Sequence, residues 1–178
     1  KVFQGAAFVF VQNGKVLYKS GYGIYDAKKN TPVNPDSSIF YTASVSKIFA
    51  SLSLMQLHEK GKCNMSDDAN KYLDKFKIDN PFSTSVTLKN LVTHTAGFES
   101  RFTGGLVKNA NEIIPLEEYF SQRMPAIAMQ PNSQISYSNN GAALAGLMVQ
   151  KISGISYDEY VQLNIFNPLG MSRSSFFQ

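Results

Sequence analysis

The chain has 178 residues, of which 43% are hydrophobic and 17% charged, and a net charge of +4. That share of apolar residues excludes a disordered or low-complexity protein, because it can bury enough surface to offset the entropy lost on folding. The single cysteine, Cys63, excludes an internal disulfide. The lysines are scattered rather than gathered in a basic stripe with interleaved aromatic residues, so no nucleic-acid partner is expected.

Several other functional classes lack their sequence signals. No stretch approaches the roughly 18 consecutive apolar residues of a membrane-spanning helix, and residues 1–7 lack the pattern of a secretory signal, which predicts a soluble chain. The two histidines, His58 and His94, are far apart in the sequence, and no phosphate-binding glycine motif or C-x-x-C pair is present. We therefore expect neither a metal nor a cofactor.

The first expected element is a β-hairpin. Residues 6–12 are apolar and β-prone, residues 15–25 continue with alternating apolar positions, and Asn13-Gly14 lies between them. Asn-Gly between two such runs favours a two-residue turn, because both central residues must accept a positive φ. The polar residues 26–38, which include two prolines, predict a loop, followed by a short extended piece at 39–41.

Helices are expected in the rest of the chain. Residues 44–60 contain neither glycine nor proline, and apolar residues recur at helical spacing until Gly61 offers a C-cap. The second face of this helix carries small uncharged residues, which predicts that the helix is buried on most sides. Shorter helices are expected at about 67–73, 87–94, 115–123, 139–153 and 157–165.

The first candidate for chemistry is Ser44-Val45-Ser46-Lys47. Residues at i and i+3 are neighbours on a helix, so the Lys47 amine can reach the Ser44 hydroxyl. Serine is a weak nucleophile that needs an adjacent base, and a desolvated lysine can serve as one. The motif alone occurs by chance about once in a chain of this length. Its place on a helix that carries no other charge before Leu57 strengthens the catalytic interpretation.

The second candidate is Tyr137-Ser138-Asn139, directly before a predicted helix. A phenol with an ordinary pKa near 10 becomes a base only when neighbouring cations stabilise the phenolate. Asn139 offers both a donor and an acceptor, which suits it to hold a lysine and a substrate amide. By themselves, these residues are more typical of a tyrosine packed in the core and an asparagine or serine that caps the helix than of a catalytic site. His94 is interpreted as a hydrogen-bonded structural residue rather than a base.

Taken together, the motifs resemble those of the serine β-lactamase and penicillin-binding-protein superfamily, and within it the branch of class C β-lactamases, D-alanyl-D-alanine carboxypeptidases and esterases. The likeness rests on S-x-x-K at Ser44 and Lys47 and on Y-x-N at Tyr137 and Asn139. Further similar segments lie along the whole chain: 13–16, 21–23, 43–47, 91–98 and 165–171.

The resemblance implies a role for each motif residue. Ser44 would attack a carbonyl to form an acyl-enzyme, and its backbone N–H would form half of the oxyanion hole. Lys47 and Tyr137 would share the task of removing the proton, and Tyr137 would then protonate the leaving group. Asn139 would hold Lys47 and the amide carbonyl of the substrate. The substrate would be a β-lactam, a D-Ala peptide or a carboxyl ester.

The resemblance also implies an α+β fold that continues beyond this chain. The family's third motif, on a strand downstream of residues 165–171, has no counterpart before Gln178. We therefore expect the N-terminal portion of a β-lactamase-like domain, lacking the C-terminal strands, with a sheet-forming hairpin and loop at 1–43 and a helical region at 44–178.

Four functional expectations follow. The 178-residue chain itself should be weak or inactive. It should self-associate or pair with a C-terminal part through the unpaired edge of the hairpin. The family's usual setting implies an extracytoplasmic protein in a bacterium. A non-catalytic module that binds penicillin or a cell-wall peptide is the alternative to an enzyme.

Overall fold

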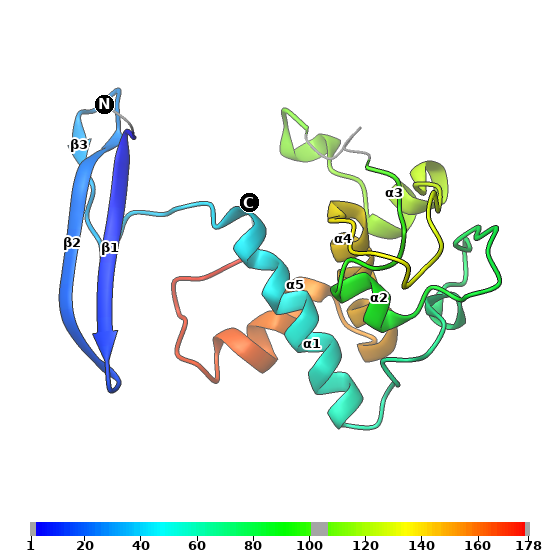
Figure 1. Ribbon diagram of the computed structural model, residues 1–178. Helices are drawn as coiled ribbons and strands as arrows, with labels where there is room; N and C mark the ends of the chain where they lie inside the picture. Colours follow the sequence, from blue (N-terminus) through cyan, green and yellow to red (C-terminus); the bar gives the residue numbers. More distant parts are fainter. Residues whose placement is uncertain (1–2, 101–106, 177–178) are drawn as a thin grey trace. The chain divides into compact units, whose positions relative to one another are not determined.

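A computed structural model describes residues 3–100 and 107–176. The chain divides into two compact units, Lys1–Ala43 and Ser44–Gln178. The first unit is a small antiparallel sheet and the second is helical (Figure 1). The predicted α+β fold class is therefore confirmed. Because the two units are separate bodies, each is described by itself.

The sheet contains the predicted hairpin. Strands β1 (Gly5–Gln12) and β2 (Lys15–Asp26) pair in antiparallel register, and β2 also pairs with β3 (Thr31–Pro32). Asn13 and Gly14 both have positive φ, 51° and 71°, as a two-residue turn of this hand requires. The loop predicted over 26–38 is thus interrupted by β3, whose pairing with the end of β2 is a contact that local composition does not encode.

Both faces of the hairpin are open to solvent. In β1, the consecutive residues Phe8, Val9, Phe10 and Val11 point alternately to opposite faces, and each is about half exposed. Of residues 3–43, Val33 alone is buried. The hairpin is held by its backbone ladder and by local contacts such as that of the Phe8 and Tyr18 rings, whose centroids lie 5.9 Å apart.

The second unit is built around helix α4 (Asn139–Ser153), which contacts the four other α-helices. Leu144, Leu147, Met148 and Val149 of α4 are fully buried in the hydrophobic core of this unit. The other helical elements of this unit are η1 (Ala43–Ser46), α1 (Lys47–Glu59), η2 (Ala69–Tyr72), α2 (Leu88–Val92), η3 (Ala110–Glu112), α3 (Leu116–Arg123), α5 (Tyr157–Val161) and η4 (Gln162–Phe166).

Local capping signals explain most of the helix boundaries. Thr87 and Asn90 form a reciprocal capping box at the start of α2. The Ser138 hydroxyl accepts a 3.0 Å hydrogen bond from the backbone N–H of Gly141, and Gly154 ends α4 in the left-handed conformation. The last predicted helix, 157–165, is α5 continued by a π-helical turn in η4. Residues 101–106 of the long stretch after Gly97 lie outside the described residues.

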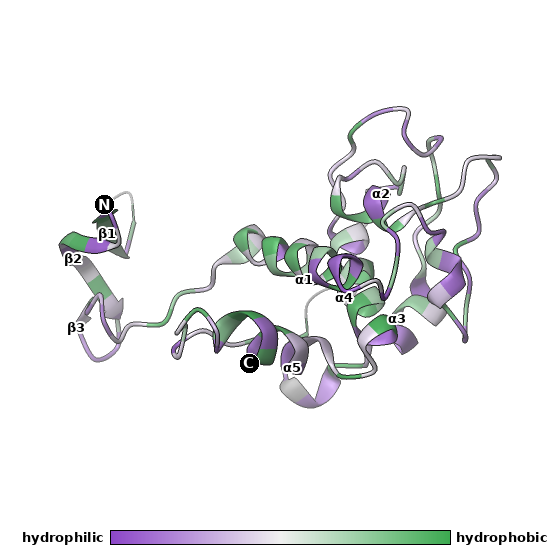
Figure 2. Cartoon of the chain, turned by 90° about the horizontal axis from the view of Figure 1, so that it is seen from below, coloured by the Kyte–Doolittle hydropathy of each residue, from purple (hydrophilic) through white to green (hydrophobic). Residues whose placement is uncertain are grey.

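The prediction that the first helix is buried on most sides is wrong for α1. Its small face, with Ala50 and Ser53, packs toward α4 together with Leu54 and Leu57. The opposite face leaves Ile48 61% and Met55 50% exposed. Hydrophobic positions, in green, run along α1 in Figure 2. Periodicity shows which residues share a face, but it cannot show whether a partner covers that face.

Candidate active site

Three predicted site residues meet in the helical unit. The Ser44 Oγ lies 2.5 Å from the phenol oxygen of Tyr137, although the two residues are 93 positions apart in the chain. The Lys47 ammonium donates a hydrogen bond of 3.1 Å to the same Ser44 Oγ. Ser44 therefore stands between a cation and a phenol, either of which can exchange a proton with it.

Local backbone geometry places Ser44 and Lys47 on one side of the chain. Ser44 lies in the 3₁₀ turn η1, and Lys47 is the first residue of α1. Side chains at i and i+3 eclipse in a 3₁₀ turn, which brings the two closer than a regular α-helix would. Ala43, directly before Ser44, has a φ of +46°, a strained conformation of the kind that gathers at functional sites.

Tyr137 has the electrostatic surroundings of a potential base. Hydrogen bonding from Lys47, and then from Ser44, lowers the pKa of the Tyr137 phenol from its ordinary value near 10. The Lys47 Nζ also lies 5.1 Å from the centre of the Tyr137 ring. Tyr137 as a whole is 53% exposed, so a ligand can approach it.

Asn139 is not joined to this cluster by a hydrogen bond. It is the first residue of α4 and is exposed, and in ranges 3–100 and 107–176 its side chain makes no hydrogen bond to Lys47. The predicted contact with Lys47 is therefore absent from this structure, whereas a contact with substrate stays a prediction. The residue after it, Asn140, is 93% buried against the core.

The segment 93–99 runs alongside the chain that leads to Tyr137, a pairing that the sequence did not predict. Phe98 and Ile127 form an isolated β-bridge, Ala128 N–H donates to the Gly97 carbonyl, and Asn132 N–H donates to the Thr95 carbonyl. The Asn90 amide, 99% buried, bonds to both Thr95 and Asn132. The run of residues 91–98 was recognised as a family likeness, but no periodicity signals this tertiary pairing.

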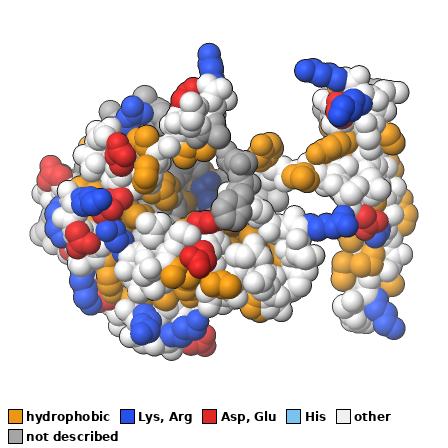
Figure 3. Space-filling view, turned by 180° about the vertical axis from the view of Figure 1, so that it is seen from behind, with side chains coloured by type: hydrophobic (Ala, Val, Ile, Leu, Met, Phe, Trp, Pro, Cys, Tyr) orange, Lys and Arg blue, Asp and Glu red, His pale blue; other side chains and the backbone are white. Residues whose placement is uncertain are grey.

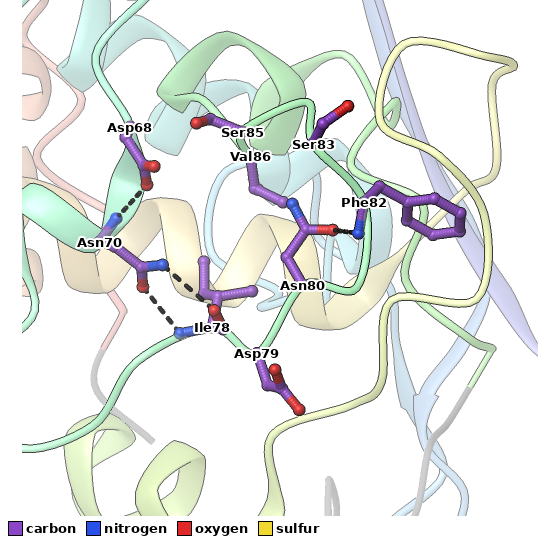
Figure 4. A pocket seen from close by; sticks show the side chains of 9 residues that line it. All are labelled: Asp68, Asn70, Ile78, Asp79, Asn80, Phe82, Ser83, Ser85 and Val86. Carbon is purple, nitrogen blue, oxygen red and sulfur yellow. Dashed lines mark hydrogen bonds between the residues drawn. The ribbon is translucent and has the colours of Figure 1, made fainter.

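A separate pocket of about 330 Å³ lies between η2 and the start of α2. Figure 4 shows its polar side chains bonding to their own loop: Asn70 to Ile78, and Asn80 to the backbone N–H of Phe82. None of Ser44, Lys47 and Tyr137 lines it. Its polar groups hold the loop, and the cluster around Ser44 remains the candidate active site.

Charge and composition add little to this picture. Lys, Arg, Asp and Glu side chains are interspersed on the face of the helical unit seen in Figure 3. In the described part of the chain, no three His, Cys, Asp or Glu side chains come together in a way that could hold a metal ion. The described helices include none of the length and apolarity needed to cross a membrane.

Comparisons with known proteins agree with the geometry. A family model described as Beta-lactamase matches residues 1–178. PbpX of Bacillus subtilis, which is named as a penicillin-binding protein, is 31% identical over 177 residues, 99% of this chain and 42% of its own length. The octameric penicillin-binding protein homologue from Pyrococcus abyssi superposes with a TM-score of 0.84 at 31% identity, over 98% of this chain and 41% of that one.

A third similarity concerns the fold alone. The β-lactamase/D-alanine carboxypeptidase from Yersinia pestis, in complex with citrate, superposes with a TM-score of 0.83 at 23% identity, over 98% of this chain and 50% of that one. In all three comparisons, the chain spans half or less of the length of the protein that it matches.

Proposed function

The chain belongs to the Beta-lactamase family, and from this premise we propose that the protein is a serine hydrolase that forms an acyl-enzyme on Ser44. The observation that supports the proposal most strongly is the hydrogen-bonded series from Lys47 through Ser44 to Tyr137. A serine between a cation and a phenol of lowered pKa has both parts of an activated nucleophile. Core packing alone does not require this arrangement at an exposed serine.

In the proposed acylation step, the Ser44 Oγ attacks the substrate carbonyl carbon while its proton passes to the deprotonated member of the Lys47 and Tyr137 pair, which is the Tyr137 phenolate beside the Lys47 ammonium or the neutral Lys47 amine beside the Tyr137 phenol. The new bond joins Oγ to carbon, and the electron pair of the C=O bond moves to oxygen. Ser44 lies in the first helical turn, where backbone N–H groups lack an intrahelical acceptor. Its N–H is therefore suited to stabilise this oxyanion.

Collapse of the tetrahedral intermediate breaks the bond to the leaving group, which takes a proton from Tyr137. Water then attacks the acyl-enzyme while Tyr137 accepts a proton from it, and Tyr137 passes this proton to the Ser44 Oγ as the ester bond breaks, which restores the free serine. Lys47 keeps the phenolate form accessible in both steps because its hydrogen bond, and to a smaller extent its charge, lowers the pKa of Tyr137. Asn139, exposed at the start of α4, is proposed to bind the amide of the substrate.

The proposed substrates are amides or esters: a β-lactam, a D-Ala peptide or a carboxyl ester. Penicillin-binding and carboxypeptidase names among the similar proteins support the first two classes. Those names also support an extracytoplasmic site of action, where cell-wall peptides lie. The cluster around Ser44 supports acyl transfer and is compatible with each of these acyl groups.

Covalent labelling of the full-length natural protein tests the proposal. A fluorescent penicillin and a fluorophosphonate are offered separately, and the wild-type protein should be labelled by at least one of them. Ser44→Ala should abolish the label. Ser121→Ala is a matched control, because it removes a hydroxyl from an exposed position in α3 and should leave labelling unchanged.

Two outcomes would contradict the proposal: a wild-type protein that neither probe labels, or a label that persists in Ser44→Ala. Turnover of unlabelled substrates then separates the enzyme from the alternative of a binding module. Release of hydrolysed product from a β-lactam, a D-Ala peptide or a carboxyl ester identifies an enzyme, whereas labelling of Ser44 without hydrolysis of any of these identifies a module that binds without turnover.

A further inference from the structure

His94 adopts a backbone conformation that needs an explanation. Its φ of +58° lies in the left-handed region, which is costly for a side chain of this size. Two hydrogen bonds accompany this conformation. The His94 carbonyl accepts from the Ser136 backbone N–H at 2.8 Å, and its ring Nδ1 accepts from the Ser138 N–H at 3.3 Å. The residues before and after Tyr137 are thus both held by one histidine.

The imidazole also contacts the residue between those two anchors. The centroids of the His94 and Tyr137 rings lie 4.6 Å apart, with the planes inclined at 44°. Aromatic pairs at this separation attract each other beyond the area that they bury. His94 therefore constrains Tyr137 from both backbone sides and on its ring.

The histidine is itself fixed by the buried network around it. Thr95, the next residue, bonds to the Asn90 amide, and its carbonyl accepts from Asn132 N–H. Gly97 follows, where a methyl group would overlap the carbonyl oxygen of Met129. These contacts connect the backbone around His94 to the core through α2. The position of His94, and with it the position of Tyr137, is therefore fixed by buried residues.

The protonation state of His94 follows from the backbone N–H that donates a hydrogen bond to its ring. A backbone N–H can only donate, so Nδ1 must carry a lone pair to accept the bond from Ser138. A protonated imidazolium has no such acceptor, and its charge would stand near Lys47. Burial, and then the charge of Lys47, lower the pKa of His94 below its ordinary value near 6.5. The neutral ring is therefore the form that the site favours.

We propose that neutral His94 is a positioning residue that holds Tyr137 in reach of Ser44 and Lys47, and that its protonation in acid releases this hold. The proposal rests on the proposed function, since it assigns a role within the same site. Lys47 on α1 and Tyr137 before α4 are the charged or titratable groups that face the imidazole among the described residues. Positioning is complete when the ring is neutral and is lost as the pH falls through the pKa of His94.

Two variants of His94 in the full-length natural protein test the proposal. Asparagine tolerates a positive φ, and its side-chain oxygen can replace Nδ1 as the acceptor without titrating. His94→Ala loses one hydrogen bond and the ring contact. It should slow acylation of Ser44 by the fluorescent penicillin or fluorophosphonate by about tenfold or more, because the hydrogen bond and the ring contact are lost together. His94→Asn should stay within about threefold of wild type.

The pH profile adds a measurement that a purely structural role would not change. The ratio of the acylation rate of the wild type to that of His94→Asn should fall in acid below the ordinary His pKa of about 6.5, because protonation of Tyr137 slows both proteins alike and protonation of His94 slows only the wild type. His58→Ala, at the end of α1, is the matched control and should keep the rate and the pH profile of the wild type. A ratio that stays constant in acid, or a wild-type rate in His94→Ala, would overturn the proposal.

A measurement independent of turnover separates this proposal from the proposed function. The phenol of Tyr137 is titrated by NMR in protein with labelled tyrosine, with Tyr137→Phe to assign the signal. Acidification through the His94 pKa should shift the Tyr137 signal in wild type and not in His94→Asn. If labelling of Ser44 fails but this shift is present, the proposed function falls and the positioning role stands. If the shift is absent, the positioning role falls.

Discussion

The two units of the chain place similar apolar residues in opposite environments. In the helical unit, leucines such as Leu54, Leu88 and Leu147 are fully buried. In the hairpin unit, Val9, Phe10 and Val16 are about half exposed. The helical unit thus has a core of its own, whereas the hairpin exposes apolar residues on both faces, and Val33, after the hairpin, is the one buried residue of the described range 3–43.

The two units obtain their structure from different interactions. The hairpin obtains its register from the backbone ladder and the Asn13-Gly14 turn, both of which are local. The helical unit obtains its geometry from tertiary packing around α4, and the candidate site belongs to it. We therefore expect free energy of unfolding to be concentrated in residues 44–178, and three predictions test this expectation.

The largest expected effect follows from a cavity in the helical core. Leu147→Ala in α4 should reduce the free energy of unfolding by about 3 kcal/mol, because Leu147 is fully buried and its neighbours cannot fill the space left. Urea unfolding followed by far-UV circular dichroism measures the change. Leu163→Ala, at a 53% exposed leucine of η4, is the matched control and should cost much less.

The corresponding change in the hairpin sharpens the comparison. Val9→Ala removes an apolar group that is already 49% exposed, so it should cost less than about 1 kcal/mol. A cost equal to that of Leu147→Ala would mean that the hairpin is packed as tightly as the helical core, and the contrast between the units would be wrong.

A smaller loss of stability is expected from a substitution at Gly97, whose backbone lies close to that of Met129. Gly97 has a φ of +81°, and an added methyl would overlap the Met129 carbonyl oxygen. Gly97→Ala should therefore cost about 2 kcal/mol or more and should also displace Tyr137. Gly61 also has a positive φ but has open space around it. Gly61→Ala therefore measures only the cost of the positive φ in the free energy of unfolding, which should be about 1 kcal/mol. Equal costs at the two glycines would contradict the close approach.

The smallest expected effect is a loss of stability in acid that originates in the helical unit. A hydrogen bond from Tyr72, and then one from the Asn64 backbone, lower the pKa of Asp67 to about 2. Since the folded pKa lies below the ordinary value, the carboxylate stabilises the fold above about pH 4 and loses this contribution as the pH falls toward about 2.

Unfolding of the Asp67→Asn variant across this range measures the contribution. The variant should show a weaker dependence on pH than wild type, and Tyr72→Phe should have the same effect in part because it removes the main donor. Hydrogen exchange should detect the acid-induced loosening in α2 and η2 before it appears in β1 and β2. Loosening that begins in the hairpin would contradict the assignment.

The sequence predicted what depends on short spacings. The hairpin follows from Asn13-Gly14, α4 follows from its capping serine and from Gly154, and the approach of Lys47 to Ser44 follows from their i, i+3 spacing. The contact of Tyr137 with Ser44 agrees with a family likeness, whereas spacing alone does not predict it. The prediction that α1 is buried on most sides was wrong because the exposure of a helix face depends on whether another element covers it. The residues of α1 alone do not determine this.

The features that the sequence did not predict share one physical cause. The strand β3, the pairing of residues 93–99 with 126–138, and the hold of His94 on Tyr137 are contacts between segments with no shared periodicity. Such contacts depend on backbone groups that every residue carries, so side-chain patterns give little signal for them. The sequence does not predict the positive φ of His94 either, because most histidines have a negative φ.

The bare edge of β1 has a consequence for how this polypeptide behaves at high concentration. Residues 6–12 form a run without charge or proline, and the first lysine after them is Lys15. Within residues 3–100 and 107–176, β1 pairs on one side only, with β2. Short, uncharged, β-prone segments of this kind stack into cross-β fibrils when their edges stay open. A single lysine in place of Val9 should delay the onset of thioflavin fluorescence without changing the chemistry at Ser44.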